Sequence, residues 1–324
     1  MKYNPKDIQA AQEHFGFLRP EPVEKDWYVT QAVGALATVD AAPFRLVFAG
    51  GTCLARAHRI VRRMSEDVDF KIVPLSTELV SGSQLRKQLG ELRKRITASL
   101  AATGFPIDPN DKSRIRSRND NHYTIYQLPY TTVAETKDML RPTIQIELTY
   151  ALLRQPSNSL PVISFVAEAF GRPAELAAID CVSITETAAE KIVALTRRTA
   201  MEHAGLSRDP DPTLVRHIYD LHLIWKHIDV STATTLARSI AVKDAEEFKN
   251  QYPAYQTDIT GETHKALIAL RSDPAIRERY SSFVAAMVYG DQVGFDAAMK
   301  TTVSLVEATW PPSKPPPIVR PHGP

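Results

Sequence analysis

The apolar positions in the first hundred residues recur mostly at the spacing of a helix. This pattern predicts a short helix over residues 5–15 and a longer one over residues 23–39. It also predicts a helix over residues 81–100, where one apolar stripe repeats every three or four residues. The side chains of that stripe are Leu85, Leu89, Leu92, Ile96 and Leu100. We expect the stripe to pack on a sheet.

The strands of such a sheet are indicated by β-branched and aromatic residues in the same half of the chain. A short apolar strand ends at the pair Gly50 and Gly51, and an Arg-rich segment, predicted to be helical, follows it. Residues 68–73, Val-Asp-Phe-Lys-Ile-Val, predict the next strand, because apolar side chains alternate along most of it. Further strands are predicted over residues 122–130 and 142–150, and a strand or short helix over residues 160–170.

Helical patterns dominate the second half of the chain. The first of these helices has an ambiguous start, since Ser183-x-x-Glu186 and Thr187-x-x-Glu190 both fit a capping box. It is expected to run to about residue 198 and to be followed by a loop over residues 200–212. Further helices are predicted over residues 214–225, 235–250, 261–272, 274–289 and 294–309.

The change of pattern near residue 180 predicts an α+β chain of two domains. Residues 1–180 would form a mixed-sheet domain with N-terminal helices, and residues 181–310 a mainly helical domain. Residues 311–324 are rich in Pro and are expected to be extended or disordered.

Composition adds few restrictions. The 324 residues are 44% hydrophobic and 23% charged, which is typical of a soluble globular protein. No run approaches the roughly 20 apolar residues that span a bilayer, and the N-terminus lacks the apolar core of a signal peptide. Two cysteines, Cys53 and Cys181, cannot form a disulfide framework. We therefore expect a cytoplasmic protein, and the net charge of +2 decides nothing about nucleic acid.

Two carboxylates on one strand are the main candidates for chemistry. Asp67 and Asp69 are two residues apart on the strand predicted around residue 70, so their side chains project from the same face. Two carboxylates at such a short distance repel each other, and each raises the proton affinity of the other. A divalent cation between them would remove this penalty, and hard oxygen ligands suit Mg²⁺.

The turn Gly50-Gly51-Thr52 precedes these acids by about 15 residues. Glycine lets a backbone approach a triphosphate closely and turn without steric cost. A helix that begins near Thr52 or Cys53 would direct free N–H groups at a phosphate. The turn, with the hydroxyl of Ser65, is therefore a candidate nucleotide-binding element.

A Gly-Gly turn followed by Asp-x-Asp on a strand resembles the signature of the polymerase-beta-like nucleotidyltransferase superfamily. Within it, residues 50–54 and 63–70 resemble the AbiEii/AbiGii branch of nucleotidyltransferase toxins, to which the mycobacterial MenT-type toxins are similar. That branch belongs to bacterial toxin–antitoxin and phage-defence systems. The resemblance implies a polymerase-beta-like domain followed by a helical one, an NTP as co-substrate, Mg²⁺ as cofactor, and a cognate antitoxin. Whether the antitoxin contacts the toxin stays open.

The resemblance also implies further site residues. Glu147 alternates onto the polar face of the strand over residues 142–150, where the superfamily supplies a third acid. Lys191 matches a lysine on a helix that faces the nucleotide in the AbiEii-like toxins. Asp220 matches the second acid of their Arg-Asp-x-x-Asp-Leu element, and His217 occupies the place of the first. Asp67, Asp69, Glu147, Lys191 and Asp220 are thus the predicted catalytic residues, and Gly50, Gly51, Thr52, Ser65 and Lys191 the predicted nucleotide-binding residues.

Simpler interpretations exist for several of these residues. Arg216 and Asp220 could pair at i, i+4 on one helix, which is worth a few tenths of a kcal/mol. Asp220 could otherwise orient Lys191 or the acceptor. Lys25, in Glu-Lys-Asp, also matches the family, but a surface turn of the helix over residues 23–39 is the favoured interpretation.

The resemblance implies an RNA acceptor, with the tRNA 3′ end as the leading candidate and a block of translation as the result. Arg114, Arg116 and Arg118 alternate and would share one face if extended, so they are the predicted RNA-binding residues. Two alternatives remain. One is transfer of the monophosphate to a Ser, Thr or Tyr of a protein, and the other is a non-catalytic nucleotide-binding module.

Overall fold

The protein is described here by a computed structural model that covers residues 3–76, 80–132, 140–141, 143–207, 211–290 and 292–312. The predicted Pro-rich tail lies outside the described residues from residue 313 onward.

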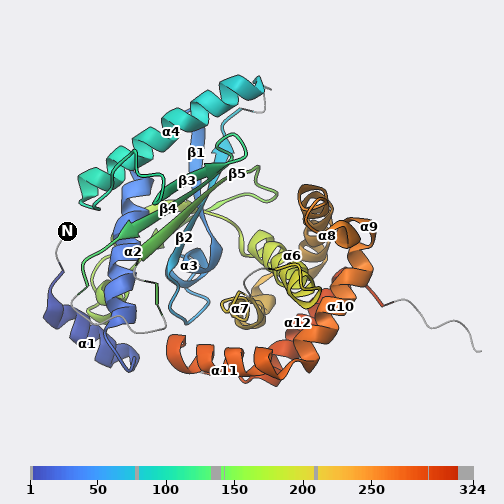
Figure 1. The fold of residues 1–324 in the computed structure, drawn as a ribbon. Coiled ribbons are helices and arrows are strands. Elements are labelled where there is room, and N and C mark those ends of the chain that lie inside the picture. Colours follow the sequence, from blue (N-terminus) through green and yellow to red (C-terminus); the bar gives the residue numbers. More distant parts are fainter. Residues whose placement is uncertain are drawn as a thin grey trace, which may run out of the picture.

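Within the described residues, seven strands form one mixed sheet in the order β3-β4-β5-β2-β1-β7-β6 (Figure 1). Two pairs are parallel, β2 with β5 and β1 with β7, and the other neighbours are antiparallel. The strands are β1 (Phe44–Ala49), β2 (Asp67–Pro74), β3 (Ile115–Arg118), β4 (Tyr123–Pro129), β5 (Thr143–Tyr150), β6 (Asn158–Val162) and β7 (Leu176–Cys181). The predicted α+β fold with a mixed sheet is confirmed.

The two faces of β2 have different surroundings. Val68, Phe70 and Ile72 point into a hydrophobic core that includes side chains of α2 (Glu21–Ala37) and α4 (Gly82–Thr103). Four of the five predicted stripe residues of α4 are fully buried in this core, and Leu85 packs at its margin. The alternate residues of β2, including Asp67 and Asp69, therefore face the opposite side.

The helices of the second half lie on that opposite side of the sheet (Figure 1). They are α6 (Ile184–His203), α7 (Arg216–Ile224), α8 (Val230–Glu247), α9 (Pro253–Thr257), α10 (Ile259–Ser272), α11 (Pro274–Met287) and α12 (Phe295–Thr309). None of the helices in the described part of the chain is both long and apolar enough to cross a membrane.

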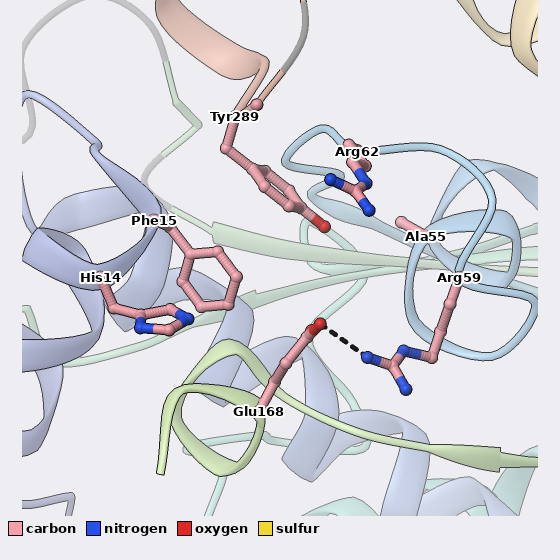
Figure 2. A pocket seen from close by; sticks show the side chains of 8 residues that line it. His14, Phe15, Ala55, Arg59, Arg62, Glu168 and Tyr289 are labelled. Carbon is pink, nitrogen blue, oxygen red and sulfur yellow. Dashed lines mark hydrogen bonds and ion pairs between the residues drawn. The ribbon is translucent and has the colours of Figure 1, made fainter. Parts of the chain in front are cut away.

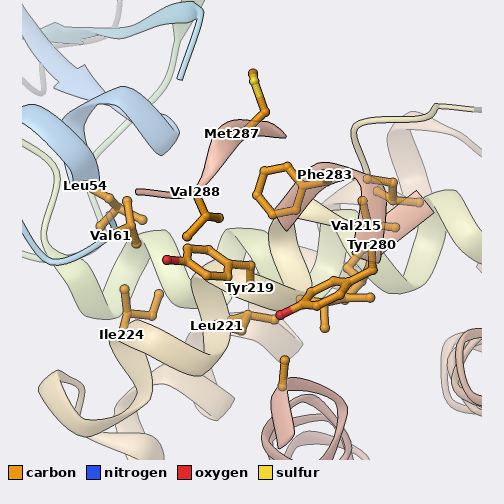
Figure 3. Close-up of a cluster of buried hydrophobic side chains, with 14 of the residues drawn as sticks. Leu54, Val61, Val215, Tyr219, Leu221, Ile224, Tyr280, Phe283, Met287 and Val288 are labelled. Carbon is orange, nitrogen blue, oxygen red and sulfur yellow. The ribbon is translucent and has the colours of Figure 1, made fainter. Parts of the chain in front are cut away.

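The hydrophobic core of the helical half also takes in residues from the start of the chain. Leu54 and Val61 pack in one cluster with Tyr219 and Val288 (Figure 3). The same cluster includes residues of α1 (Pro5–Phe15) and of α5 (Phe165–Ala169). A domain normally has a core of its own. The division at residue 180 therefore stays a prediction, although the last strand ends at Cys181.

Local details at α3 (Gly50–Arg56) and α6 differ from the sequence-based expectations or decide between them. Helix α3 begins at the first glycine rather than near Thr52, and it ends before most of the arginines that were expected to be helical. The first of the two capping boxes starts α6, since the Ser183 hydroxyl accepts the N–H of Glu186 at 3.1 Å. That helix continues to His203, into the segment predicted to be a loop.

Candidate active site

Three carboxylates from two neighbouring strands lie next to one another. Asp67 and Asp69 share a face of β2, and Asp69 is paired with Glu147 in the parallel register of β2 and β5. Burial, followed by the charges of Glu147 and Asp67, raises the pKa of Asp69 well above its usual value. A cation would compensate the negative charge of this cluster, as was predicted from Asp67 and Asp69 alone.

Asp67 and Glu147 already have polar partners. Arg141 donates to Asp67, while Glu147 accepts from the Gln145 amide at 2.6 Å and from the Tyr123 hydroxyl at 2.8 Å. In the part of the chain that the structure describes, no three His, Cys, Asp or Glu side chains are grouped so as to hold a metal ion. The donor set is that of a Mg²⁺ site, so Mg²⁺ fits the chemistry, but Asp67 would have to turn away from Arg141.

The two glycines of the turn are required by close contacts with side chains at this site. Gly50 has φ +72°, and a Cβ there would lie 1.9 Å from Oδ2 of Asp69. At Gly51 a Cβ would lie 2.3 Å from Nη2 of Arg63 and 3.1 Å from Oγ of Ser65. Glycine therefore allows the start of α3 to approach the carboxylate side chain closely.

We expect Gly50→Ala to lower both stability and nucleotide transfer, because it adds a clash with Asp69 to the strain of a positive φ. Gly16→Ala is a matched control. Gly16 has φ +71° but nothing within 4 Å of a new Cβ, so it should lose only about 1–2 kcal/mol. Chemical denaturation and a transfer assay would measure both variants. Equal losses in the two would contradict the close-contact explanation.

The hydroxyl of Thr52 has a partner within the protein, so its predicted nucleotide-binding role stays a prediction for the backbone alone. Its hydroxyl donates to the backbone carbonyl of Asp67, and the residue is 1% exposed. It is not among the residues that line the cavity at the acids, whereas Gly50, Gly51 and Ser65 are. The Thr52 side chain therefore fixes α3 to β2 and is not available to a phosphate.

Lys191 reaches the site from α6 and is held there by Asp220. Nζ of Lys191 lies 2.8 Å from Oδ2 of Asp220, and the guanidinium of Arg63 binds both oxygens of the same carboxylate, at 2.6 and 2.7 Å. Burial alone would raise the pKa of Asp220, but the two cations outweigh it and keep the pKa below its usual value. Asp220 is fully buried and does not line the cavity, so its contacts are with Lys191 and Arg63.

His217 lies beside this group. Its Nδ1 is 3.5 Å from Nζ of Lys191, and burial together with the Lys191 charge lowers the pKa of His217 well below its usual value. The imidazole is therefore neutral near pH 7.

The three acids, the two glycines, Ser65, Lys191 and His217 line one cavity of about 230 Å³. The three acids line its sheet side, and Lys191 lines its helical side. Residues that had not been predicted as site residues also line it: Arg63, Thr187, Glu190, Ala194, Arg198, Thr213 and Arg216. The cavity thus combines carboxylates with several cations, which is the charge pattern that a metal-bound polyphosphate requires.

A second ionic cluster supports the sheet side of the cavity. Glu66 is 3% exposed, and it binds Lys25 at 2.6 Å and Arg216 at 3.2 Å. These cations lower the pKa of Glu66 to about 2 although burial opposes them. The interpretation of Lys25 as a surface residue is wrong, since it is 0% exposed. The suggested Arg216–Asp220 pair is also wrong, because Arg216 turns to Glu66 instead.

The predicted RNA-binding arginines lie outside the cavity. Arg116 and Arg118 are exposed on β3, and Arg114 directly precedes that strand. Arg114 pairs with Asp111 at 3.5 Å, and the guanidinium of Arg118 lies 4.8 Å from the ring centroid of Tyr123, which contacts Glu147. Their predicted role stays a prediction.

Comparison with known proteins decides the family. The sequence model described as nucleotidyl transferase AbiEii toxin, type IV toxin–antitoxin system, matches residues 36–301. The chain belongs to the AbiEii family. The match includes the whole AbiEii cavity described above, from Gly50 to His217. An AbiEii protein is a nucleotidyl transferase toxin of a type IV toxin–antitoxin system, so the recognition from residues 50–70 is confirmed.

A solved structure resembles this AbiEii chain over nearly its whole length. MenT4, a nucleotidyltransferase toxin from Mycobacterium tuberculosis H37Rv, is 18% identical and has a TM-score of 0.55. The alignment covers 94% of this chain and 89% of MenT4, so the two share a fold. No curated protein sequence matches the chain.

Proposed function

We propose that this AbiEii protein transfers a nucleoside monophosphate from an NTP to a hydroxyl of an RNA, with the tRNA 3′ end as the leading acceptor. The observation that carries the proposal is one cavity lined by Asp67, Asp69, Glu147, Lys191 and the Gly50–Gly51 turn. Such a transfer on the tRNA 3′ end would block translation.

The carboxylates of Asp67, Asp69 and Glu147 are the groups that would hold Mg²⁺. Bound there, Mg²⁺ would lower the pKa of the acceptor hydroxyl and screen charge on the leaving pyrophosphate. Asp69 stands between the other two acids, so its ionisation depends most on a nearby cation. Glu147 is kept in place by Gln145 and Tyr123 before any ligand binds.

The helical side of the cavity would bind the triphosphate. Lys191 is 6% exposed and is oriented by Asp220, so its ammonium is already positioned when the nucleotide enters. Backbone N–H groups at the start of α3 and the Ser65 hydroxyl are further donors at the same cavity. Asp220 is a positioning residue in this proposal, since it touches Lys191 and Arg63.

Purified protein incubated with α-labelled NTPs, Mg²⁺ and total tRNA should transfer label to the RNA, and EDTA should stop the transfer. A parallel incubation with a protein extract tests transfer to protein hydroxyls. Label in protein alone would replace the RNA acceptor by a protein one. No label and no pyrophosphate release with any of the four NTPs would favour a non-catalytic module.

A further inference from the structure

A second and larger cavity, of about 470 Å³, lies apart from the active site (Figure 2). We call it the Arg62 cavity. Side chains from four separate segments line it, among them His14, Phe15, Arg59, Arg62, Glu168 and Tyr289. None of these side chains lines the active-site cavity or has a part in the reaction proposed above.

The cavity carries an excess of positive charge. Arg62 is exposed, and its guanidinium has no hydrogen bond or ion pair with any residue that the structure describes. The Glu168 carboxylate is the acid in the cavity, and it is already compensated by Arg59 at 2.7 Å and by the buried Arg56 at 3.5 Å. Arg62 is therefore available to an anion. A guanidinium is well suited to a phosphate, which it binds through two parallel N–H bonds.

Aromatic rings form the side of the cavity that faces these arginines (Figure 2). The ring centroids of Phe15 and Tyr289 are 5.1 Å apart, and those of His14 and Phe15 are 4.8 Å apart. Tyr289 is fixed by Arg56, which donates to its hydroxyl at 2.6 Å. Partly exposed aromatic rings beside arginines suit a nucleotide, because the base can stack while a guanidinium binds the phosphate.

The backbone of Arg59 is a separate indication of a ligand site. Its φ is +56°, a conformation that residues other than glycine seldom adopt. Such backbone strain is concentrated at functional sites, where the surrounding structure holds it in place. The Arg59 side chain lines the cavity, where it is paired with Glu168.

The Arg62 cavity is joined to the active site by two short elements. Arg63 forms an isolated antiparallel bridge with Val288. Arg62 and Tyr289, which are next to these two residues in the chain, line the Arg62 cavity, while Arg63 lines the active-site cavity. Helix α3 also spans both, because Gly51 lines the active site and Ala55, about 6 Å farther along the helix, lines the Arg62 cavity.

We propose that the Arg62 cavity binds a nucleotide of the acceptor RNA away from the reacting end, with its phosphate at Arg62 and its base against Phe15 and Tyr289. The inference rests on the proposed RNA acceptor and adds a second anchor point to it. A strand held at both cavities would be fixed relative to the carboxylates, which would favour acceptors long enough to reach both.

The test compares Arg62→Glu with Arg271→Glu, which makes the same charge change at an exposed position on α10 that lines neither cavity. The probe is a short fluorescein-labelled single-stranded RNA that copies the tRNA 3′ end, and binding is measured by fluorescence anisotropy at several salt concentrations. Arg62→Glu should weaken binding on the order of tenfold, as expected for loss of a charge-assisted contact. It should also reduce the dependence of log K on log salt by about 0.7, the value for one single-strand phosphate contact.

Each outcome supports or overturns the proposal. Ultraviolet crosslinks between the RNA and Phe15 or Tyr289 in the wild-type protein would support it. Equal RNA binding by Arg62→Glu and Arg271→Glu would overturn it. If Arg62→Glu weakens binding of AMP, measured as a free nucleotide, but leaves binding of the RNA unchanged, the proposal is overturned as well. Transfer of label is measured separately. If Arg62→Glu weakens RNA binding but the wild type labels only protein, the proposed acceptor is wrong and the Arg62 cavity is an RNA-binding site that does not hold the acceptor.

Discussion

Asp69→Asn should lose nucleotide transfer by at least about a hundredfold, because a metal-bound carboxylate contributes several kcal/mol to stabilising charge in the transition state. The same substitution should leave the metal-free protein as stable as before, or more stable. The amide side chain has nearly the shape of the carboxylate, but it would not add a third negative charge beside Glu147 and Asp67. Burial and these two charges are what raise the pKa of Asp69. Activity and stability are thus expected to change in opposite directions.

The measurement for Asp69→Asn is label transfer with Mg²⁺, alongside thermal unfolding in EDTA. The repulsion has a definite pH dependence. A carboxyl group whose pKa is raised in the folded protein makes folding less favourable as the pH rises from its unfolded value of about 4 toward its folded value. Asp69→Asn should remove that loss of stability. Full transfer activity in the variant would contradict the assignment of Asp69 to the metal site.

Asp220→Ala should be among the most destabilising single substitutions in the chain. It leaves Arg63 and Lys191 buried without their shared carboxylate. Removal of one partner from a buried ion pair costs about 3–5 kcal/mol, since the remaining charge is uncompensated. Because the pKa of Asp220 is held below its unfolded value, this contribution is present above about pH 4 and is lost as the pH falls further. The variant should therefore lose less stability on acidification than the wild type.

Lys191→Met separates the catalytic role from the structural one. Asp220 keeps its two bonds to Arg63 in this variant, so the loss of stability should be well below that of Asp220→Ala. Transfer should still fall by about a hundredfold or more, because the cation predicted to bind the triphosphate is gone. Urea denaturation and the labelling assay measure the two effects. If Lys191→Met destabilises the protein as much as Asp220→Ala but still transfers label, Lys191 is a structural residue.

Much of the site could be predicted because its signals are local in the sequence. The spacing of Asp67 and Asp69 places both on one face of a strand whatever the rest of the fold does. The alternation in β5 likewise assigned Glu147 to a polar face, and the structure pairs it with Asp69. The AbiEii resemblance was carried by short, contiguous motifs, and the match over residues 36–301 confirmed it.

The errors in prediction came from residues whose partners are remote in the chain. Lys25 looked like a surface residue because nothing near it in the sequence shows that Glu66 lies 2.6 Å away. Arg216 has a local acid at the right helical spacing, Asp220, yet it binds Glu66, because the fold brings Arg63 and Lys191 to Asp220 instead. The hydroxyl of Thr52, one of its two predicted phosphate donors, instead donates to the backbone carbonyl of Asp67 on β2.

The sequence by itself determined most of the helices, the strands β1, β2, β4 and β5, the carboxylate face and the family, since each depends on side-chain types at short, fixed spacings. Only the tertiary structure decided which cations meet which acids, and that Arg62 and Tyr289, far apart in the chain, share a cavity. The physical reason is that Coulomb and hydrogen-bond energies depend on distance in space. That distance is set by how the helices pack on the sheet, which no local pattern records.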